Sequence, residues 1–153
     1  MPGLSGDSLV ETVDGPVAMA KLAGKSVPVL TRLPDGQIGF RLMRDVACTT
    51  AGAPVLRVVL DNGQSIVVEP GHQVYRKGMA ATPAGTLAPG DLVETSFHFP
   101  EGYELTRTDG TKERSAGAVR VAAVEDAGTA DVFTSSVNET GTYFTTAGVL
   151  LAG

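Results

Sequence analysis

The chain has 153 residues, a length typical of one domain. Its formal net charge is −5, and its lysines and arginines form no basic stripe. This excludes nucleic-acid binding as the main function, because phosphate contacts need clustered cations. No apolar run approaches the ~20 residues that span a bilayer. No basic segment followed by an apolar one opens the chain, so no signal peptide is visible and the compartment stays open.

The single cysteine, Cys48, excludes an intrachain disulfide. Cys48, His72 and His98 are potential metal ligands, but their spacing matches no zinc motif. We therefore expect no metal site and no cofactor. We expect Cys48 to be a small buried side chain in a strand. We expect His98, which lies between two phenylalanines, on the outward face of another strand.

Short valine-rich segments separated by glycine-containing turns recur along the chain. An apolar period of 3.6 residues is confined to one or two turns around residues 17–22. This pattern predicts an all-β protein with strands at roughly ten-residue spacing. The predicted strands are residues 9–13, 27–31, 38–46, 55–60, 64–69, 91–95, 119–125, 131–137, 143–145 and 149–151.

Four turn dipeptides punctuate these strands: Asp14-Gly15, Asp35-Gly36, Asn62-Gly63 and Asp109-Gly110. Each is typical of a type I′ hairpin turn, in which both central residues have positive φ. Asn62-Gly63 should join strands 55–60 and 64–69 into an antiparallel hairpin. The polar segment 102–117 is predicted to be an exposed hairpin or a mobile loop.

A weak internal repeat links "MAKLAGKSVPVL" (residues 19–30) to "AGTLAPGDLVET" (residues 84–95). Both place Leu-Ala ahead of a glycine, then a charged residue, then a strand. A separation of 65 residues indicates two halves related by a pseudo-twofold axis. Chance can also produce so short a match.

Taken in order, several motifs resemble the Hint domain, the fold shared by Hedgehog proteins and inteins. Gly3 is followed by "LSGDS", by "LVET" and by Asp14-Gly15. "VVEPGHQVY" carries His72 where the family has Thr-x-x-His. "LAPGDLV" and the ending "DVFTSSVNETGTYFTTAGVLLAG" also follow the family pattern. The resemblance is closest to small bacterial intein-like domains that lack a homing endonuclease.

This resemblance covers residues 3–153 and implies a single domain, an all-β, horseshoe-like fold with pseudo-twofold related halves. It also implies a single-turnover, cis-acting autoprocessing element. Its partners would be its own flanking host-protein segments, and we expect a monomer that binds neither nucleic acid nor membrane. In the family, an N-terminal cysteine or serine attacks the preceding carbonyl. The Thr-x-x-His residues assist, and a terminal His-Asn dipeptide cleaves the downstream junction.

The sequence keeps the family's scaffold motifs but lacks most of its reacting groups. His72 stands at the histidine that assists the N-terminal acyl shift, and Gly141 stands roughly where many members carry a further histidine. Five positions are substituted: Gly3 (nucleophile), Glu69 (motif threonine), Thr134 (motif aspartate), Ala152 (penultimate histidine) and Gly153 (terminal asparagine). We expect the Glu69 carboxylate to oppose a developing oxyanion.

Nearby side chains do not replace the missing groups. Ser5 is two residues from Gly3, a shift of about 6–7 Å along an extended chain. Ser8 is further away, and Asn138 cannot cyclise at a distant scissile bond. Whether this chain is an enzyme therefore stays open. We expect a chain with this sequence to be inactive in autoprocessing.

Two interpretations follow. The chain is an inactive form of a protein-splicing or autocleaving Hint domain, or it is a naturally degenerate Hint domain that serves as a structural or binding β-module. Paired substitutions at both ends favour deliberate inactivation. Glu69 and Thr134 favour natural decay, because inactivation does not require them.

Overall fold

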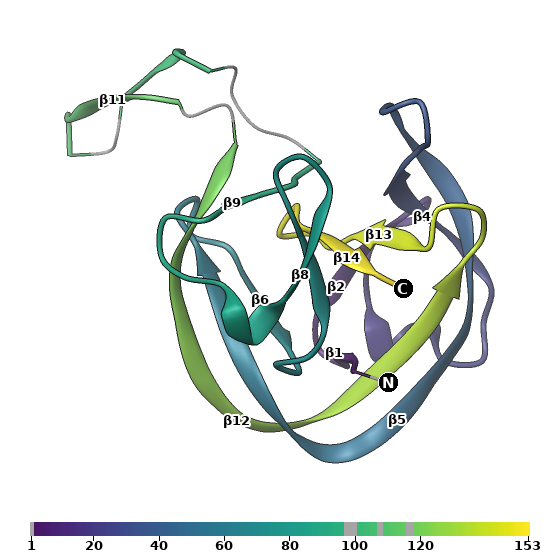
Figure 1. The fold of residues 1–153 in the computed structure, drawn as a ribbon. Helices are drawn as coiled ribbons and strands as arrows, with labels where there is room; N and C mark the ends of the chain where they lie inside the picture. The colour runs from purple at the N-terminus through teal and green to yellow at the C-terminus, as the bar shows by residue number, and fades with distance from the viewer. Residues whose placement is uncertain (1, 97–100, 107–108, 116–117) are drawn as a thin grey trace.

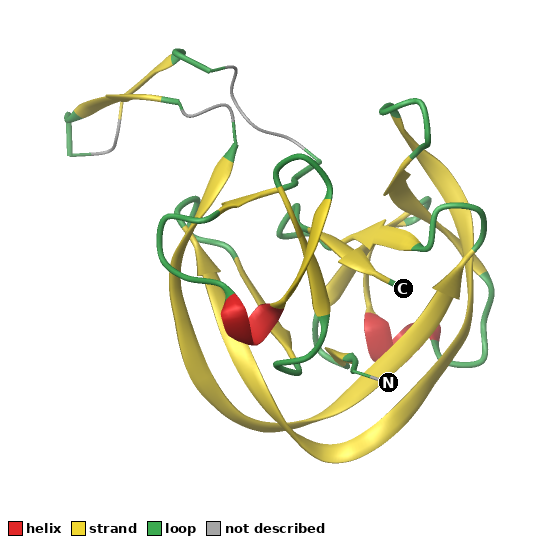
Figure 2. Cartoon of the chain, in the orientation of Figure 1, coloured by secondary structure: helices red, strands yellow, loops and turns green. Residues whose placement is uncertain are grey.

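The computed structural model describes residues 2–96, 101–106, 109–115 and 118–153. Almost every described element is a β-strand, and two short 3-10 turns supply the helical structure (Figure 2). The predicted all-β class is confirmed. His98 lies outside the described residues. No helix in the described ranges is long and apolar enough to cross a membrane.

The elements follow one another through the chain as strands β1 to β14 with the 3-10 turns η1 and η2. Their bounds are β1 Leu4–Ser5, β2 Leu9–Thr12, β3 Gly15–Ala18, η1 Met19–Leu22, β4 Val27–Arg32, β5 Ile38–Leu60, β6 Ser65–Val68, β7 Gln73–Arg76, β8 Ala80–Pro83, η2 Ala84–Thr86, β9 Leu92–Val93, β10 Glu104–Thr106, β11 Lys112–Arg114, β12 Val119–Val137, β13 Thr142–Phe144 and β14 Leu150–Ala152.

Two long strands, β5 and β12, form the frame of the molecule. They pair antiparallel along most of their length and curve together into a deep U (Figure 1). The sequence predicts two strands in each of these regions, and the structure merges each pair into one. Positive φ at Gly52 and Gly128, with several register shifts between the strands, lets the ladder bend without ending.

The two halves repeat one pairing pattern. In the first half, β2 pairs with β3 and β4, and β4 pairs with β5. In the second half, β7 pairs with β8 and β9, and β9 pairs with β12. η1 and η2 occupy equivalent places before β4 and β9, where the repeat predicts a turn that leads into a strand. The predicted pseudo-twofold relation is thus visible in the topology.

Buried apolar side chains from both halves form one main core. Leu4, Val10 and Met19 come from the first half, and Val74 and Leu151 lie with the second. All five are fully buried. Leu4 lies in a two-residue strand between β12 and β6, so burial of a single side chain near Gly3 anchors the start of the chain.

The turn type predicted from the Asx-Gly dipeptides is wrong. Gly15, Gly36, Gly63 and Gly110 have φ between 83° and 91°, whereas the residues before them are not in the left-handed region. In the β5–β6 hairpin, Asn62 Oδ1 accepts a hydrogen bond from Gln64 N at 2.9 Å. The side chain therefore stabilises the turn locally, and only the glycine needs positive φ.

Of two other predictions from the sequence, one is wrong and one agrees with the structure. Cys48 lies in β5, but its side chain is exposed rather than buried, because this part of β5 has a run of exposed residues. The polar segment 102–117 contains an antiparallel hairpin of β10 and β11, in agreement with the predicted exposed hairpin. Figure 1 shows this hairpin projecting from the second half.

We predict that Gly63→Val lowers the free energy of unfolding by about 1 kcal/mol or more, because a β-branched residue is costly at positive φ. Gly63 has φ +83, and the space that a Cβ would occupy is open, so backbone strain alone causes the loss. Gly63→Asn, which tolerates this conformation better, should cost less. Equal denaturation midpoints for Gly63→Val and the unchanged chain would show that the turn tolerates the change.

Candidate functional site

Both ends of the chain reach one pocket on the concave side of the β5–β12 frame (Figure 1). We call it the chain-end pocket. Its volume is about 210 Å³, and its lining residues are Pro2, Gly71, His72, Gln73, Thr134, Ser135, Gly141, Tyr143, Ala152 and Gly153. The structure therefore brings together five of the seven motif positions singled out from the sequence: His72, Thr134, Gly141, Ala152 and Gly153. Gly3 and Glu69 lie beside it, next to Pro2.

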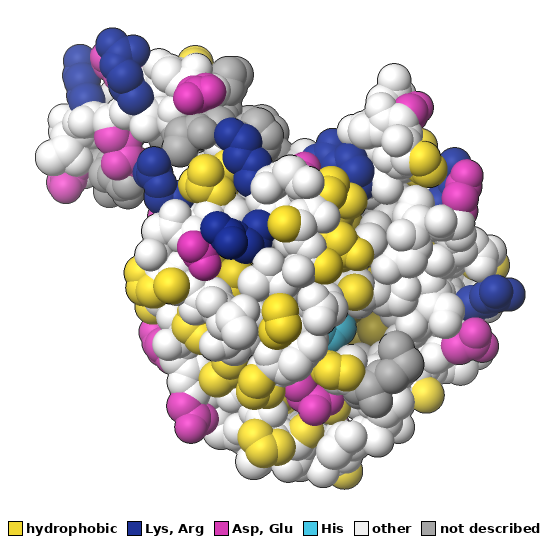
Figure 3. Space-filling view, in the orientation of Figure 1, with side chains coloured by type: hydrophobic (Ala, Val, Ile, Leu, Met, Phe, Trp, Pro, Cys, Tyr) yellow, Lys and Arg dark blue, Asp and Glu magenta, His cyan; other side chains and the backbone are white. Residues whose placement is uncertain are grey.

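His72 follows the turn after β6 and is 5% exposed. His72 N donates to Glu69 O at 3.0 Å, and His72 O accepts from Ala84 N at 2.9 Å. The backbone is thus fixed on both sides, which holds the ring inside the pocket. A histidine lies in a hollow of the face that carries both chain ends, and His72 is the one histidine among the described residues (Figure 3).

The His72 ring lies against the peptide bond that precedes Gly3. His72 Nδ1 is 3.3 Å from the Pro2 carbonyl oxygen. Because a carbonyl only accepts hydrogen bonds, this contact requires a proton on Nδ1 and leaves the lone pair of a neutral ring on Nε2. Burial lowers the pKa of His72, while the Pro2 and Ala152 carbonyls and the Glu69 carboxylate act in the opposite direction.

Glu69 holds the same peptide bond from its nitrogen side. Glu69 Oε1 accepts a hydrogen bond from Gly3 N at 3.0 Å, and Glu69 N donates to Gly3 O at 3.0 Å. The sequence predicts this carboxylate near a developing oxyanion. The structure places it on the amide nitrogen instead, while His72 faces the carbonyl oxygen of the same bond.

Backbone hydrogen bonds fix Gly153 at the other side of the pocket. Gly153 N donates to Gly141 O at 2.9 Å, and Gly153 O accepts from Val137 N at 3.3 Å. Gly141, roughly at a position where the family has a histidine, contributes only its backbone here. The carbonyl of Gly153 consequently has a defined direction at the end of β14.

The pocket closes tightly around both glycines. A Cβ on Gly3 would lie 2.6 Å from the Phe133 carbonyl oxygen, and a Cβ on Gly153 would lie 2.5 Å from two ring carbons of Tyr143. Distances this short require movement of the neighbouring atoms. The packing of this chain thus suits glycine at the two positions where the family has reacting side chains.

Two polar residues of the pocket, Ser135 and Tyr143, were not predicted from the sequence. Ser135 Oγ, the Tyr143 hydroxyl and His72 Nε2 are buried, and none has a hydrogen-bond partner among the described residues. Burial raises the pKa of Tyr143 well above its ordinary value. Both residues lie within the ending that follows the family pattern, but neither was assigned a role in the site from the sequence, and the tertiary structure brings them beside His72.

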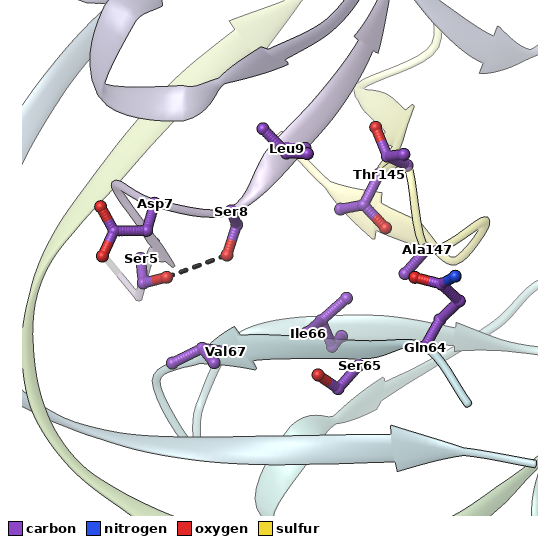
Figure 4. A pocket seen from close by; sticks show the side chains of 11 residues that line it. Ser5, Asp7, Ser8, Leu9, Gln64, Ser65, Ile66, Val67, Thr145 and Ala147 are labelled. Atoms are coloured by element: carbon purple, nitrogen blue, oxygen red, sulfur yellow. Dashed lines mark hydrogen bonds between the residues drawn. The ribbon is translucent and has the colours of Figure 1, made fainter.

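Ser5 and Ser8 belong to a different pocket of about 240 Å³, between β1, β6 and the turn after β13 (Figure 4). Ser5 Oγ and Ser8 Oγ lie 2.9 Å apart and are hydrogen-bonded to each other. Neither lines the chain-end pocket. Their placement agrees with the expectation that they do not replace the nucleophile at residue 3.

No group of three or more His, Cys, Asp or Glu side chains that could hold a metal ion occurs among the described residues. Cys48 is exposed on β5 while His72 is buried in the chain-end pocket. The pocket itself carries one imidazole, hydroxyl groups and backbone amides. Such a set suits hydrogen bonding and proton transfer at the two peptide junctions.

Comparison with solved structures identifies the fold. The chain superposes on the G-1F mutant of the Ssp DnaB mini-intein variant M86 with a TM-score of 0.77, at 15% identity over 100% of this chain and 99% of that one. A DnaB intein from Synechocystis sp. PCC 6803 gives 0.74 at 13% identity, with 100% and 99% covered. A bacterial intein-like domain from Clostridium thermocellum gives 0.67 at 17% identity, with the same coverage.

Sequence comparison identifies fewer similar proteins than the structural comparison does. No family model matches the chain. The chain is 32% identical over 117 residues to the B subunit of DNA gyrase from Synechocystis sp. (strain ATCC 27184 / PCC 6803 / Kazusa). That match covers 66% of this chain and 11% of the gyrase protein, so the chain spans about a tenth of this curated relative.

We predict that Gly3→Ala lowers the free energy of unfolding by about 1–3 kcal/mol, the usual cost of overpacking. The added methyl would meet the Phe133 backbone, which cannot rotate away. Gly71→Ala is the matched control, because its Cβ would meet only the exposed Pro2 ring, at 3.2 Å. Denaturant unfolding measures both, and equal losses would contradict the tight packing at Gly3.

We predict that His72 is neutral at pH 7, because burial lowers its pKa below the ordinary 6.5. The unfolded chain then binds a proton at residue 72 before the folded chain does. The contribution of neutral His72 to the free energy of unfolding is fully present above pH 6.5, and it is lost as the pH falls toward the folded-state pKa. His72→Gln should remove this part of the pH dependence. Imidazole titration by NMR measures the pKa directly, and a value above 6.5 would overturn the prediction.

Proposed function

We propose that this chain, which has the all-β Hint fold of mini-inteins without an endonuclease, is an intein-like protein-splicing or autoproteolytic element. It acts on its own flanking peptide bonds and is present here in a form that lacks the family's reacting groups. Residues 3–153 form a single domain in this proposal. Its partners are the flanking host-protein segments, and it works as a monomer without nucleic acid.

One observation carries the proposal: a buried histidine lies between the two junctions. His72 Nδ1 contacts the carbonyl of Pro2, and the Ala152 carbonyl also acts on the ring. A proton donor at a scissile carbonyl stabilises the charge that develops when the carbonyl is attacked. An imidazole that touches both ends of one chain supports cleavage in cis rather than action on a separate substrate.

In this proposal, Gly3, Ala152 and Gly153 are the substitutions that prevent the family's reaction. Glycine at residue 3 offers no side chain to attack Pro2, and glycine at residue 153 offers no amide to cyclise. The match to 11% of the gyrase protein agrees with a domain carried inside a longer protein. That relative's activity is not assigned to this chain.

A second candidate function is favoured by the packing around the glycines. The Phe133 backbone and the Tyr143 ring occupy the space that side chains at residues 3 and 153 would need. A naturally degenerate Hint domain that serves as a structural or binding β-module would show this closure. Together with Glu69 and Thr134 at motif positions, it argues for natural decay over deliberate inactivation.

Restoring the missing groups tests the proposal. The variant carries Gly3→Cys, Ala152→His and Gly153→Asn between two short peptides, with a cysteine first in the downstream one. We expect a small thiol to release the upstream peptide. We expect cyclisation of the new terminal asparagine to release the downstream peptide and leave a succinimide on the domain. Because a side chain at residue 3 must displace β1 from Phe133, both reactions should be slow. Mass spectrometry identifies both products.

Matched controls separate the two junctions. Adding His72→Ala to the restored chain should slow upstream cleavage by about 10²–10⁴-fold, the usual contribution of a general acid or base. Leaving Gly153 unchanged should remove the succinimide product alone. A restored chain that folds, shown by circular dichroism, and cleaves at neither junction would reject autoprocessing in favour of the β-module.

A further inference from the structure

We propose that Ser135 is a nucleophile that cleaves the peptide bond following Gly153 when the chain is extended beyond that residue. The proposal rests on the proposed function only in that the substrate is a flanking peptide bond. It assigns a different reacting group, on β12, which does not depend on the residues missing at positions 3 and 153.

Ser135 lies directly against Gly153, the residue whose carbonyl would be attacked. Its Oγ is 3.0 Å from the position of a Cβ on Gly153, a point two bonds from the Gly153 carbonyl carbon. The Oγ is buried in the chain-end pocket and has no hydrogen-bond partner among the described residues. A buried hydroxyl without a partner is costly, so its persistence in a pocket needs an explanation.

A local irregularity of the β5–β12 ladder lies opposite Ser135. Thr134 pairs with Ala47 and Ser136 pairs with Arg44, so β5 carries an extra residue opposite Ser135. Asp45, within that extra stretch, has φ 57. Side chains normally alternate across a strand, yet both Thr134 and Ser135 line the pocket. The extra residue belongs to β5, and β-bulges are common beside active sites.

The electrophile is also held in place. Val137 N donates to Gly153 O at 3.3 Å, and Gly153 N is bonded to Gly141 O at 2.9 Å. A backbone N–H on the carbonyl oxygen is the donor that stabilises a tetrahedral oxyanion. His72 lines the same pocket, and its contact with Pro2 O puts the proton on Nδ1 and leaves a lone pair on Nε2. Neither Nε2 nor Ser135 Oγ has a hydrogen-bond partner among the described residues, so the two atoms must approach each other before Nε2 can accept the Ser135 proton.

The reaction balances as the hydrolysis of one peptide bond. Ser135 Oγ forms a bond to the Gly153 carbonyl carbon while its proton passes through His72 to the departing amine. The bond from Gly153 to the next nitrogen breaks, which releases the downstream segment and leaves Gly153 esterified to Ser135. Water then attacks this ester, Gly153 becomes a free carboxylate and Ser135 regains its proton.

The test uses the chain with its sequence unchanged, extended after Gly153 by a soluble reporter that begins with alanine. We expect slow release of the reporter at neutral pH, with the fragment ending at Gly153. Hydroxylamine should trap the ester, so that the fragment ends as the hydroxamate instead of the acid. Intact-protein mass spectrometry distinguishes these ends. A folded fusion that releases no reporter would overturn the proposal.

Three variants assign the nucleophile. Ser135→Ala should reduce release at least tenfold and remove the hydroxamate, a change of about 1.4 kcal/mol or more in the barrier. Ser135→Cys should form a thioester that a small thiol cleaves. Ser136→Ala, an exposed neighbour on the same strand, should leave the rate unchanged. Equal release from Ser135→Ala and the unchanged chain would assign the cleavage to another group. Residue 3 stays glycine throughout, so this result is independent of the restored-chain test.

Discussion

The antiparallel pairing of β5 and β12 is the constraint on which the rest of the structure depends. These strands bend together, and two residues of β12, Thr134 and Ser135, line the chain-end pocket. β1 lies on the same stretch, with Leu4 opposite Phe133, and β14 pairs with β7. Gly3 packs against Phe133 and Gly153 against Ser135, so two nearby residues of β12 contact residues from opposite ends of the sequence. The left-handed glycines that let the long strands bend therefore contribute to the geometry of the site.

The sequence predicted the parts of this fold that depend on local chemistry. Valine-rich segments indicated the strands, and the Asn62-Gly63 hairpin and the repeated turn before β4 and β9 agree with the structure. It did not predict that residues 38–46 and 55–60 belong to one strand, because the residues between them include Gly52 and Pro54 and break the alternation of apolar side chains. Long-range pairing with β12 overrides that local weakness.

The residues of the site also fall into two groups, those that the sequence indicated and those that only the structure revealed. Ordered motifs in the sequence indicated His72, Thr134, Ala152 and Gly153, and these four residues line one pocket. Ser135 and Tyr143 lie within the ending that follows the family pattern, but that pattern gives neither a role in the site, and the tertiary structure places them beside Gly153. Neither of these positions can be predicted from a single sequence. The exposure of Cys48 was not predicted for a related reason, since it lies in an exposed run of β5, residues 47–52, that local composition does not reveal.

The two peptide junctions differ in what the pocket provides. At Pro2–Gly3, the carbonyl oxygen faces His72 and the nitrogen is held by the Glu69 carboxylate, but no hydroxyl is bonded there among the described residues. At Gly153, the carbonyl is held by Val137 N and a buried hydroxyl lies beside it. Since nucleophilic cleavage needs a nucleophile, an oxyanion donor and a base together, the downstream side has the more complete set. In the two proposed reactions, glycine at residue 3 lacks the upstream nucleophile, whereas His72 lines the pocket that also contains Gly153.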